Sequence, residues 1–250
     1  MLRASPLFPL DHGHHTCVFY RTDDELLEFL VPYFAEGLRK GEYCFGAQKP
    51  HIRERLFTGL RWFGIDTKEY IRRGAFDIHT DEEVYFSHNK FDPGAMIDML
   101  LCAMDEALAK GFTALRSAGE LTWAISSPDM WAQVLDYEAR VDQCFPGRAM
   151  TGICQYNAAA CSSGDFDAVV ERHYSHVSDT SPGSSHTHIT VRNEDHWADV
   201  IADQSAPNPN FYYVVQPRHT AEPVGWGIAP TFEFATENAQ RIVTGDHKRS

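Results

Sequence analysis

The sequence lacks long apolar runs and an excess of basic residues, and both absences exclude broad classes of protein. No apolar segment approaches the roughly 20 residues that span a bilayer, and residues 1–10 contain one Arg and no continuous apolar core of a secretory signal. Its 22 Lys and Arg stand against 35 Asp and Glu, and the net charge of −13 opposes binding to a polyanion. We therefore expect a cytoplasmic protein that binds neither a membrane nor nucleic acid directly.

The motifs of common enzymes are also missing. The chain has no Gly-x-Ser-x-Gly and no His-Glu-x-x-His motif. No Gly-Lys-Ser/Thr loop follows the first predicted strand, and the strand predicted at 112–117 contains no acidic residue to hold Mg²⁺. ATP hydrolysis would therefore lack both its phosphate-binding loop and its metal ligand. We expect that the protein is not an enzyme.

The cysteines show no Cys-x-x-Cys spacing, and most of them lie in apolar segments. They are Cys17, Cys44, Cys102, Cys144, Cys154 and Cys161. In a chain of 250 residues this pattern favours reduced, buried thiols over a disulfide framework.

What the sequence does contain is a regular alternation of helical and strand-like segments. Apolar spacing predicts helices at 23–40, 52–63, 93–111 and 166–173, with a further helix after Pro128. Short apolar runs predict strands at 14–20, 43–45, 75–78, 112–117 and 150–156. This order is typical of an α/β fold in which helices sandwich a mainly parallel sheet.

The character of the chain changes after residue 177. A Ser-, Pro- and Gly-rich stretch predicts a linker at 178–188, between a core domain at 12–177 and a short, irregular C-terminal extension at 189–250. Within the extension, 211–215 and 232–234 have the composition of strands. The extension can be a lid, a sheet-edge cap or an assembly element.

Six motifs follow one another along the core domain. They are Gly13-His14-His15-Thr16-Cys17 with Tyr20, the segment 34–44, Leu115-Arg116-Ser117-Ala118-Gly119-Glu120 with Trp123, Tyr137-Glu138-Ala139-Arg140, Ile153-Cys154-Gln155-Tyr156, and Arg172-His173. In this order they resemble the MEDS family, a sensory domain of methanogen and methylotroph regulators. Asn157 and Tyr174 depart from the family pattern, which has an acidic residue and a proline there.

The resemblance implies a core like that of RecA and KaiC that has lost its phosphate-binding loop. It also implies that the domain senses a small organic molecule, of the class of simple hydrocarbon derivatives. Because no output domain is visible, the partner is expected in trans, as a kinase, an anti-sigma-type protein or a transcription regulator. A homodimer is also possible.

His15 and Cys17 lie two positions apart on a predicted strand, so their side chains share one face. They can contact a ligand or a soft metal such as zinc, or they can be a buried thiol and a hydrogen-bonded imidazole. Cys154 and His173 would complete a Cys2His2 set if the strands are neighbours. No cofactor is expected, but zinc at these four residues is possible.

Arg116, Glu120 and Trp123 follow one another at the end of a predicted strand, where α/β folds bind ligands. Together with His15, Cys17, Cys154 and His173 they form the candidate ligand site. Alternatively, Arg116 and Glu120 pair to fix a loop. Tyr137 and Glu138 are expected to be structural, with Glu138 turned inward to pair with Arg116. The acidic run 81–83 is expected to be a solvated loop.

Three kinds of function are compatible with these features. The first is a ligand-binding sensor, the second a ligand-free interaction or scaffold module, and the third a metal- or thiol-dependent enzyme. A ligand-filled pocket favours the first, a dry core without a pocket the second, and a reactive thiol or an open metal position the third.

Overall fold

The computed structural model describes residues 12–86 and 90–173 with their side chains, and the backbone of strands at 175–179, 186–192, 196–203, 210–217 and 225–229. The chain divides into two compact units, Met1–His173 and Tyr174–Ser250. The two units are described separately below.

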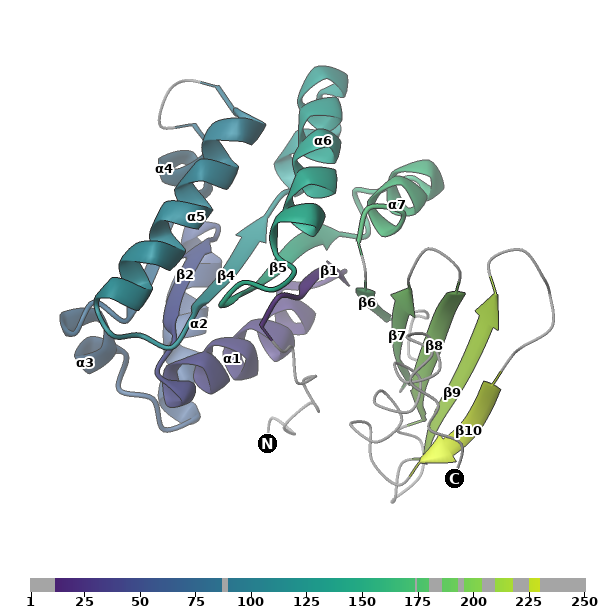
Figure 1. Ribbon diagram of the computed structural model, residues 1–250, viewed down its shortest axis with the longest axis horizontal. Coiled ribbons are helices and arrows are strands. Elements are labelled where there is room, and N and C mark those ends of the chain that lie inside the picture. The colour runs from purple at the N-terminus through teal and green to yellow at the C-terminus, as the bar shows by residue number, and fades with distance from the viewer. Residues whose placement is uncertain are drawn as a thin grey trace. The chain divides into compact units, whose positions relative to one another are not determined.

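The first unit is built on five parallel strands in the order β1-β5-β4-β2-β3 (Figure 1). The strands are β1 (His15–Tyr20), β2 (Tyr43–Ala47), β3 (Phe76–His79), β4 (Leu115–Glu120) and β5 (Met150–Asn157). The parallel register is continuous across them. Cys154 on β5 lies opposite Cys17 of β1 on one side and opposite Gly119 of β4 on the other. The prediction of an α/β fold with a parallel sheet is confirmed.

Helices cover both faces of this sheet. They are α1 (Asp23–Lys40), α2 (Pro50–Trp62), α3 (Thr67–Arg72), α4 (Asp81–Tyr85), α5 (Pro93–Ala109), α6 (Pro128–Cys144) and α7 (Ser163–Val170), with a 3₁₀ turn at Thr122–Ser126. Helices α1 and α2 pack together on one face, and α5 and α6 pack together on the other (Figure 1). The strands are buried on both sides, as parallel sheets require.

Helix α1 has the bounds that its apolar spacing predicts. The Thr22 side chain caps its first turn by accepting from the Glu25 amide, and Gly41 ends it in the left-handed conformation at φ 76°. The first turn carries Asp23, Asp24 and Glu25. Because this helix start follows β1, where a phosphate loop would lie in an ATPase, three carboxylates there oppose phosphate binding.

The structure corrects three details of the predicted elements. Strand β4 occupies 115–120 rather than 112–117, and the short helix α3 was not predicted. The acidic run 81–83 is not a loop but the first turn of α4, where Thr80 and Glu83 form a reciprocal cap. Asp81 itself is buried, whereas Glu82 and Glu83 are exposed.

The second unit is an antiparallel meander. Its strands are β6 (Ser175–Asp179), β7 (His186–Arg192), β8 (His196–Asp203), β9 (Asn210–Pro217) and β10 (Gly225–Ala229), each paired with the next. The extension is therefore more regular than predicted, and the expected linker 178–188 overlaps β6 and β7. The strand predicted at 211–215 is confirmed within β9, and the one predicted at 232–234 lies outside the described residues.

None of the helices in the described ranges combines the length and the apolar character that a bilayer span needs.

Candidate functional site

Four buried side chains from four separate segments meet on the face of the sheet that α6 covers. His15 begins β1, Glu138 lies on α6, Cys154 lies on β5 and His173 follows α7. Each offers one nitrogen, oxygen or sulfur atom, and these four atoms all lie within 4.8 Å of one another. We call these residues the His15–Glu138–Cys154–His173 cluster.

Glu138 lies at the centre of the cluster. Its Oε2 is 3.3 Å from His15 Nε2 and 3.2 Å from His173 Nε2, and its Oε1 accepts a hydrogen bond from the Tyr156 hydroxyl. His15 Nε2 is also 3.1 Å from Cys154 Sγ. Among the described residues, Glu138 Oε2 has no hydrogen bond of good geometry. Two imidazole nitrogens, a thiol and a carboxylate oxygen therefore converge on one buried point.

Burial and charge act against each other in the cluster. Burial disfavours an ionised Glu138, but attraction to His173 and contacts with His15 hold the pKa of that carboxyl well below its usual range. Burial also disfavours a charged His15, yet Asp142 and Glu138 raise its pKa to about 9. Burial, with the charge of Glu138, raises the pKa of the Cys154 thiol. At neutral pH these directions make Glu138 the anion and keep Cys154 protonated.

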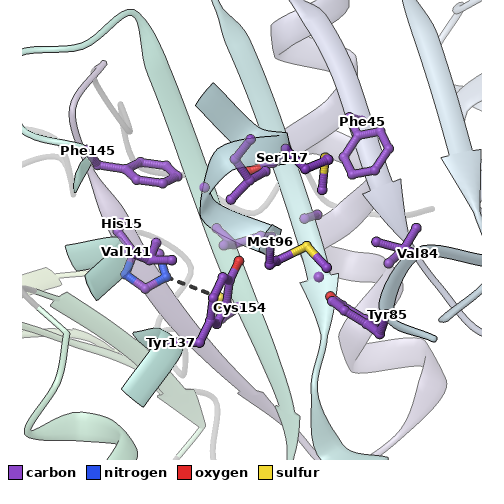
Figure 2. A pocket seen from close by; sticks show the side chains of 17 residues that line it. His15, Phe45, Val84, Tyr85, Met96, Ser117, Tyr137, Val141, Phe145 and Cys154 are labelled. Carbon is purple, nitrogen blue, oxygen red and sulfur yellow. Dashed lines mark hydrogen bonds between the residues drawn. The ribbon is translucent and has the colours of Figure 1, made fainter. Parts of the chain in front are cut away.

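An apolar cavity of about 20 Å³ lies between the sheet and helices α5 and α6, and His15 and Cys154 form part of its wall (Figure 2). The other walls are mainly apolar and include Phe45, Val84, Tyr85, Met96, Met99, Leu100, Tyr137, Val141 and Phe145. The backbone at Gly119 and Gly152 also borders the space. This volume holds about one water-sized molecule.

Three members of the predicted Cys2His2 set come together, and the fourth does not. Cys17 lies on the same strand face as His15 and opposite Cys154 in register, fully buried in the apolar core. Glu138 occupies the remaining corner of the four-residue group. Helical periodicity had indicated that Glu138 turns inward, but not which residues it meets.

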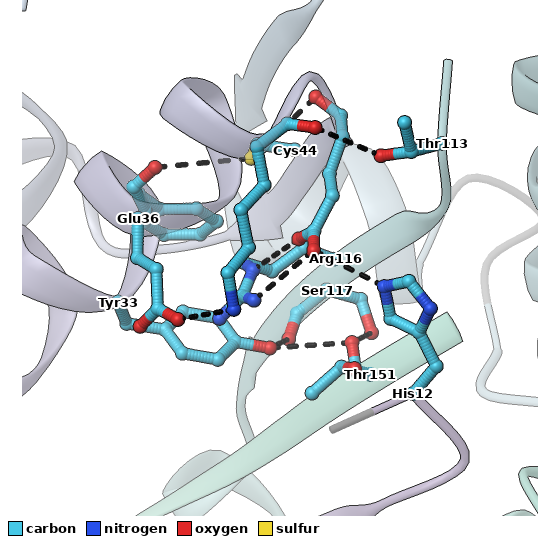
Figure 3. A network of polar contacts seen from close by, with 11 residues as sticks. His12, Tyr33, Glu36, Cys44, Thr113, Arg116, Ser117 and Thr151 are labelled. Carbon is cyan, nitrogen blue, oxygen red and sulfur yellow. Dashed lines mark hydrogen bonds and ion pairs between the residues drawn. The ribbon is translucent and has the colours of Figure 1, made fainter. Parts of the chain in front are cut away.

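Arg116 lies on the other face of the sheet, against α1 (Figure 3). Its Nε pairs with Glu42, its Nη2 is 3.3 Å from the second Glu42 oxygen, and its guanidinium lies 4.7 Å from the centre of the Tyr33 ring. A Cβ on Gly37 would come within 2.5 Å of the Arg116 side chain. The predicted pairing of Arg116 with Glu138 is wrong, because Arg116 leaves β4 on the face that α1 covers, whereas Glu138 comes from α6 on the opposite face.

Glu120 ends β4 and belongs neither to the His15–Glu138–Cys154–His173 cluster nor to the Arg116–Glu42 pair. It accepts a hydrogen bond from the Tyr20 hydroxyl at 3.0 Å and lies 3.8 Å from Lys49 Nζ, so it does not pair with Arg116. The Trp123 indole donates to the Glu120 backbone carbonyl at 3.1 Å, and its ring packs against Tyr85. Trp123 thus anchors the loop after β4 and supports one wall of the cavity from behind.

Sequence reasoning missed a group of polar residues at the carboxyl ends of the strands. Gln155 is opposite Glu120 in register, and Gln48 follows β2. Among the described residues, both amides are buried without hydrogen-bond partners, as is one oxygen each of Asp81 and Glu120. Gln48 ends an apolar run, and no sequence signal marked it. Asp142, beside His15, was missed as well. Tyr137, predicted to be structural, is a wall of the cavity.

Comparisons with known proteins were made for the whole chain. Residues 14–174 match the model of a family described as MEDS, the MEthanogen/methylotroph, DcmR Sensory domain. The transcriptional repressor DcmR of Methylorubrum extorquens is 28% identical over 157 residues, which are 62% of this chain and 56% of the repressor. The chain thus matches a little over half the length of that regulator.

Two solved structures from Pyrococcus horikoshii are similar in fold. One is an uncharacterized protein in complex with an unknown peptide, with a TM-score of 0.49, 11% identity, and coverage of 83% of this chain and 93% of that one. The other is a KaiC-like protein with a TM-score of 0.46 and 10% identity, with coverage of 88% and 91%.

Proposed function

This chain belongs to the MEDS family of sensory domains, and we propose that it binds a small organic molecule of the class of simple hydrocarbon derivatives and signals its presence through a protein–protein contact. The observation that carries the proposal is the apolar cavity, whose wall includes two buried polar side chains, His15 and Cys154. Small-molecule sites combine such walls with a few fixed polar groups.

The size of the cavity favours a very small ligand. At about 20 Å³ it matches one water-sized molecule, so a compound of a few heavy atoms must displace side chains to enter. Met96 and Met99 line the cavity from α5. Methionine side chains are unbranched and change rotamer readily, so these two can make the space that the ligand needs.

The same walls offer a route for the signal. Helix α5 contributes Met96, Met99 and Leu100, and α6 contributes Tyr137 and Val141. The remaining walls are α4, Phe145 and the sheet. A ligand that fits better when these helices move away from the sheet shifts the population toward that arrangement. A kinase, an anti-sigma-type protein or a transcription regulator that contacts the helices in trans would read the change. The regulatory role of the DcmR repressor supports this direction.

The test is ligand-dependent stability. We expect dichloromethane or methanol, as one-carbon compounds of this class, to raise the midpoint of thermal unfolding in a saturable way. At a ligand concentration of 100 times Kd, the free energy of unfolding should increase by about 2.7 kcal/mol. Leu100→Phe fills the cavity and should abolish the effect. Leu108→Phe, the same change at an exposed position of α5, should retain it.

Two outcomes would contradict the sensor. One is that neither compound, nor another one- or two-carbon halide, alcohol or aldehyde, stabilises the folded protein. The other is that Leu100→Phe and Leu108→Phe respond alike, which would place binding outside the cavity.

A protein-interaction module is the second candidate, and a groove between α1 and α2 favours it. The groove has a volume of about 690 Å³, with apolar walls that include Leu27, Val31 and Trp62. Trp62 is 82% exposed. Glu28 and Glu54 also line the groove, together with an ion pair of Arg55 and Asp24, so an apolar helix with basic flanks is the complementary partner. Trp62→Glu should abolish partner binding, and Leu108→Glu should not.

An enzyme that uses Cys154 as a nucleophile fits less well. The attacking species would be the thiolate, and burial together with Glu138 raises the pKa of this thiol rather than lowering it.

A further inference from the structure

We propose that the His15–Glu138–Cys154–His173 cluster binds one divalent transition-metal ion, with Zn²⁺ as the best match to its ligand atoms. The inference does not depend on the organic ligand. It assigns a role to Glu138 and His173, which do not line the cavity, together with His15 and Cys154, which do. Four arguments carry it, from ligand chemistry, distances, ring orientation and hydrogen bonding.

The ligand types suit a borderline-soft metal. Two imidazoles, one thiol and one carboxylate are the donors that zinc takes in proteins, whereas Mg²⁺ and Ca²⁺ take oxygen ligands only. The four donors come from β1, α6, β5 and the segment after α7. A metal at this point would join one helix and a chain segment to two neighbouring strands of the sheet.

Three contacts of the cluster are close to the ligand spacing of a tetrahedral site. With zinc bonds of 2.0–2.3 Å, ligand atoms of a tetrahedral site lie roughly 3.3–3.8 Å apart. The contacts of the cluster are 3.1 Å for His15 Nε2 to Cys154 Sγ, 3.3 Å for His15 Nε2 to Glu138 Oε2, and 3.2 Å for His173 Nε2 to Glu138 Oε2. All four ligand atoms lie within 4.8 Å of one another, so an ion at their centre requires small outward shifts of these close pairs and an inward shift of any wider pair.

Both imidazoles are turned as metal ligands are. His173 Nδ1 is 2.8 Å from the Val169 carbonyl, which can only accept, so this nitrogen carries the proton and Nε2 presents its lone pair to the cluster. His15 also directs Nε2 inward, and its Nδ1 faces an Asp142 oxygen at 3.7 Å, which is longer than a hydrogen bond. A carbonyl or carboxylate behind each imidazole is the usual outer support of a metal-bound histidine.

The hydrogen bonds of the cluster do not satisfy both carboxylate oxygens of Glu138. Glu138 Oε1 already accepts from the Tyr156 hydroxyl, and within the described residues its buried Oε2 has no hydrogen bond of good geometry. His15 and His173 lie within ion-pair distance of Oε2, at 3.3 and 3.2 Å, but a buried carboxylate oxygen that accepts no well-directed hydrogen bond is still costly. A cation on Oε2 removes that cost and also stabilises the thiolate of Cys154. Its binding releases two protons to solvent, one from Cys154 and one from His15, which is protonated at neutral pH in the metal-free cluster.

The experiment titrates the full-length chain, reduced and freed of metal, with Co²⁺ alone and then with Zn²⁺ alone. We expect one equivalent of Co²⁺ to bind and to give the visible bands of tetrahedral cobalt, with a near-ultraviolet sulfur-to-cobalt charge-transfer band. Zn²⁺ should bleach both. Cys154→Ser should lose the charge-transfer band, and His173→Gln should weaken binding by at least ~100-fold.

Cys17→Ser is the matched control, because Cys17 is buried on the same strand face but lies outside the four-residue group. It should leave the cobalt spectrum unchanged. If Cys154→Ser fails to fold, the wild-type charge-transfer band and its insensitivity to Cys17→Ser decide the question. The proposal is overturned if the folded wild type shows no charge-transfer band, or if it binds cobalt only with octahedral, oxygen-type bands at surface groups such as His79 and Asp77.

Discussion

Arg116 and Glu42 form an ion pair that is almost completely enclosed, with each side chain about 1% exposed. The pair lies between the sheet and α1, where Tyr33 covers the guanidinium and His12 Nε2 lies 3.2 Å from a Glu42 oxygen. Removing one partner of a buried pair leaves an uncompensated charge, which is more damaging than losing the attraction itself. Arg116 and Glu42 therefore support the fold rather than the ligand site.

The first prediction concerns this pair. Arg116→Ala should lower the free energy of unfolding by about 3–5 kcal/mol, because Glu42 is then buried and unpaired. Arg72→Ala is the control, since Arg72 forms an exposed pair with Glu69 that contributes less than about 1 kcal/mol. Urea denaturation measures both. Equal losses in the two variants would contradict a structural role for Arg116.

The second prediction follows from the pKa of Glu42. Burial opposes its ionisation, but Arg116 and His12 lower its pKa below the unfolded value of about 4.3. A carboxyl whose pKa is depressed by folding stabilises the protein above the unfolded pKa and loses this contribution as pH falls through the folded pKa. The stability difference between wild type and Glu42→Gln should therefore be constant from about pH 7 to about pH 5 and shrink below about pH 4. A difference independent of pH in that range would be inconsistent with an ionised Glu42.

The fold was predictable wherever local periodicity decides the element. Helix α1 has the predicted bounds, because Thr22 and Gly41 mark its ends in the sequence as clearly as its apolar residues mark its buried face. Strand β4 begins three residues later than predicted. Its second half carries Gly119 and Glu120, residues that are rare in strands and were read as a loop. Long-range packing, not local preference, places them in the sheet.

The candidate site was predictable only in part, for a related reason. Spacing places His15 and Cys17 on one face, but it does not say which of them a distant helix meets. In the structure His15 contacts Glu138, whereas Cys17 packs into the apolar core. Similarly, Gln48 and Gln155 are ordinary polar residues in the sequence, and only the register of the strands shows that both end at the same edge beside Glu120.

The third prediction concerns Asp81, whose pKa is raised to about 7 by burial and by the charge of Glu120. A carboxyl whose pKa is raised by folding destabilises the folded state once the pH rises above the unfolded pKa of about 3.9. Asp81→Asn should therefore stabilise the protein at about pH 8, by an amount on the order of 1–2 kcal/mol, and have little effect near pH 4. Glu82→Gln, an exposed change in the same helix, should show no such trend. An Asp81→Asn effect of the same size at both pH values would mean that folding does not raise the pKa of Asp81.

The fourth prediction tests how closely the cavity wall is packed. A Cβ added at Gly119 would overlap the Tyr85 hydroxyl, whereas the next atom of that ring, Cζ, is 3.6 Å away, an ordinary contact. Gly119→Ala should therefore destabilise the protein by about 1–3 kcal/mol through overpacking. Tyr85→Phe removes the one overlapping atom, so the double variant should recover most of the loss.

The double-mutant cycle separates this clash from a backbone effect of alanine. If the hydroxyl is responsible, the coupling between positions 119 and 85 is positive and close in size to the loss in Gly119→Ala alone. If the strand itself rejected a side chain at Gly119, Tyr85→Phe would restore nothing, and the cavity wall would be fixed by the sheet rather than by α4. The two outcomes also bear on sensing, because Tyr85 and Gly119 both line the cavity. If removal of one hydroxyl lets the wall relax, a bound ligand can displace the same wall.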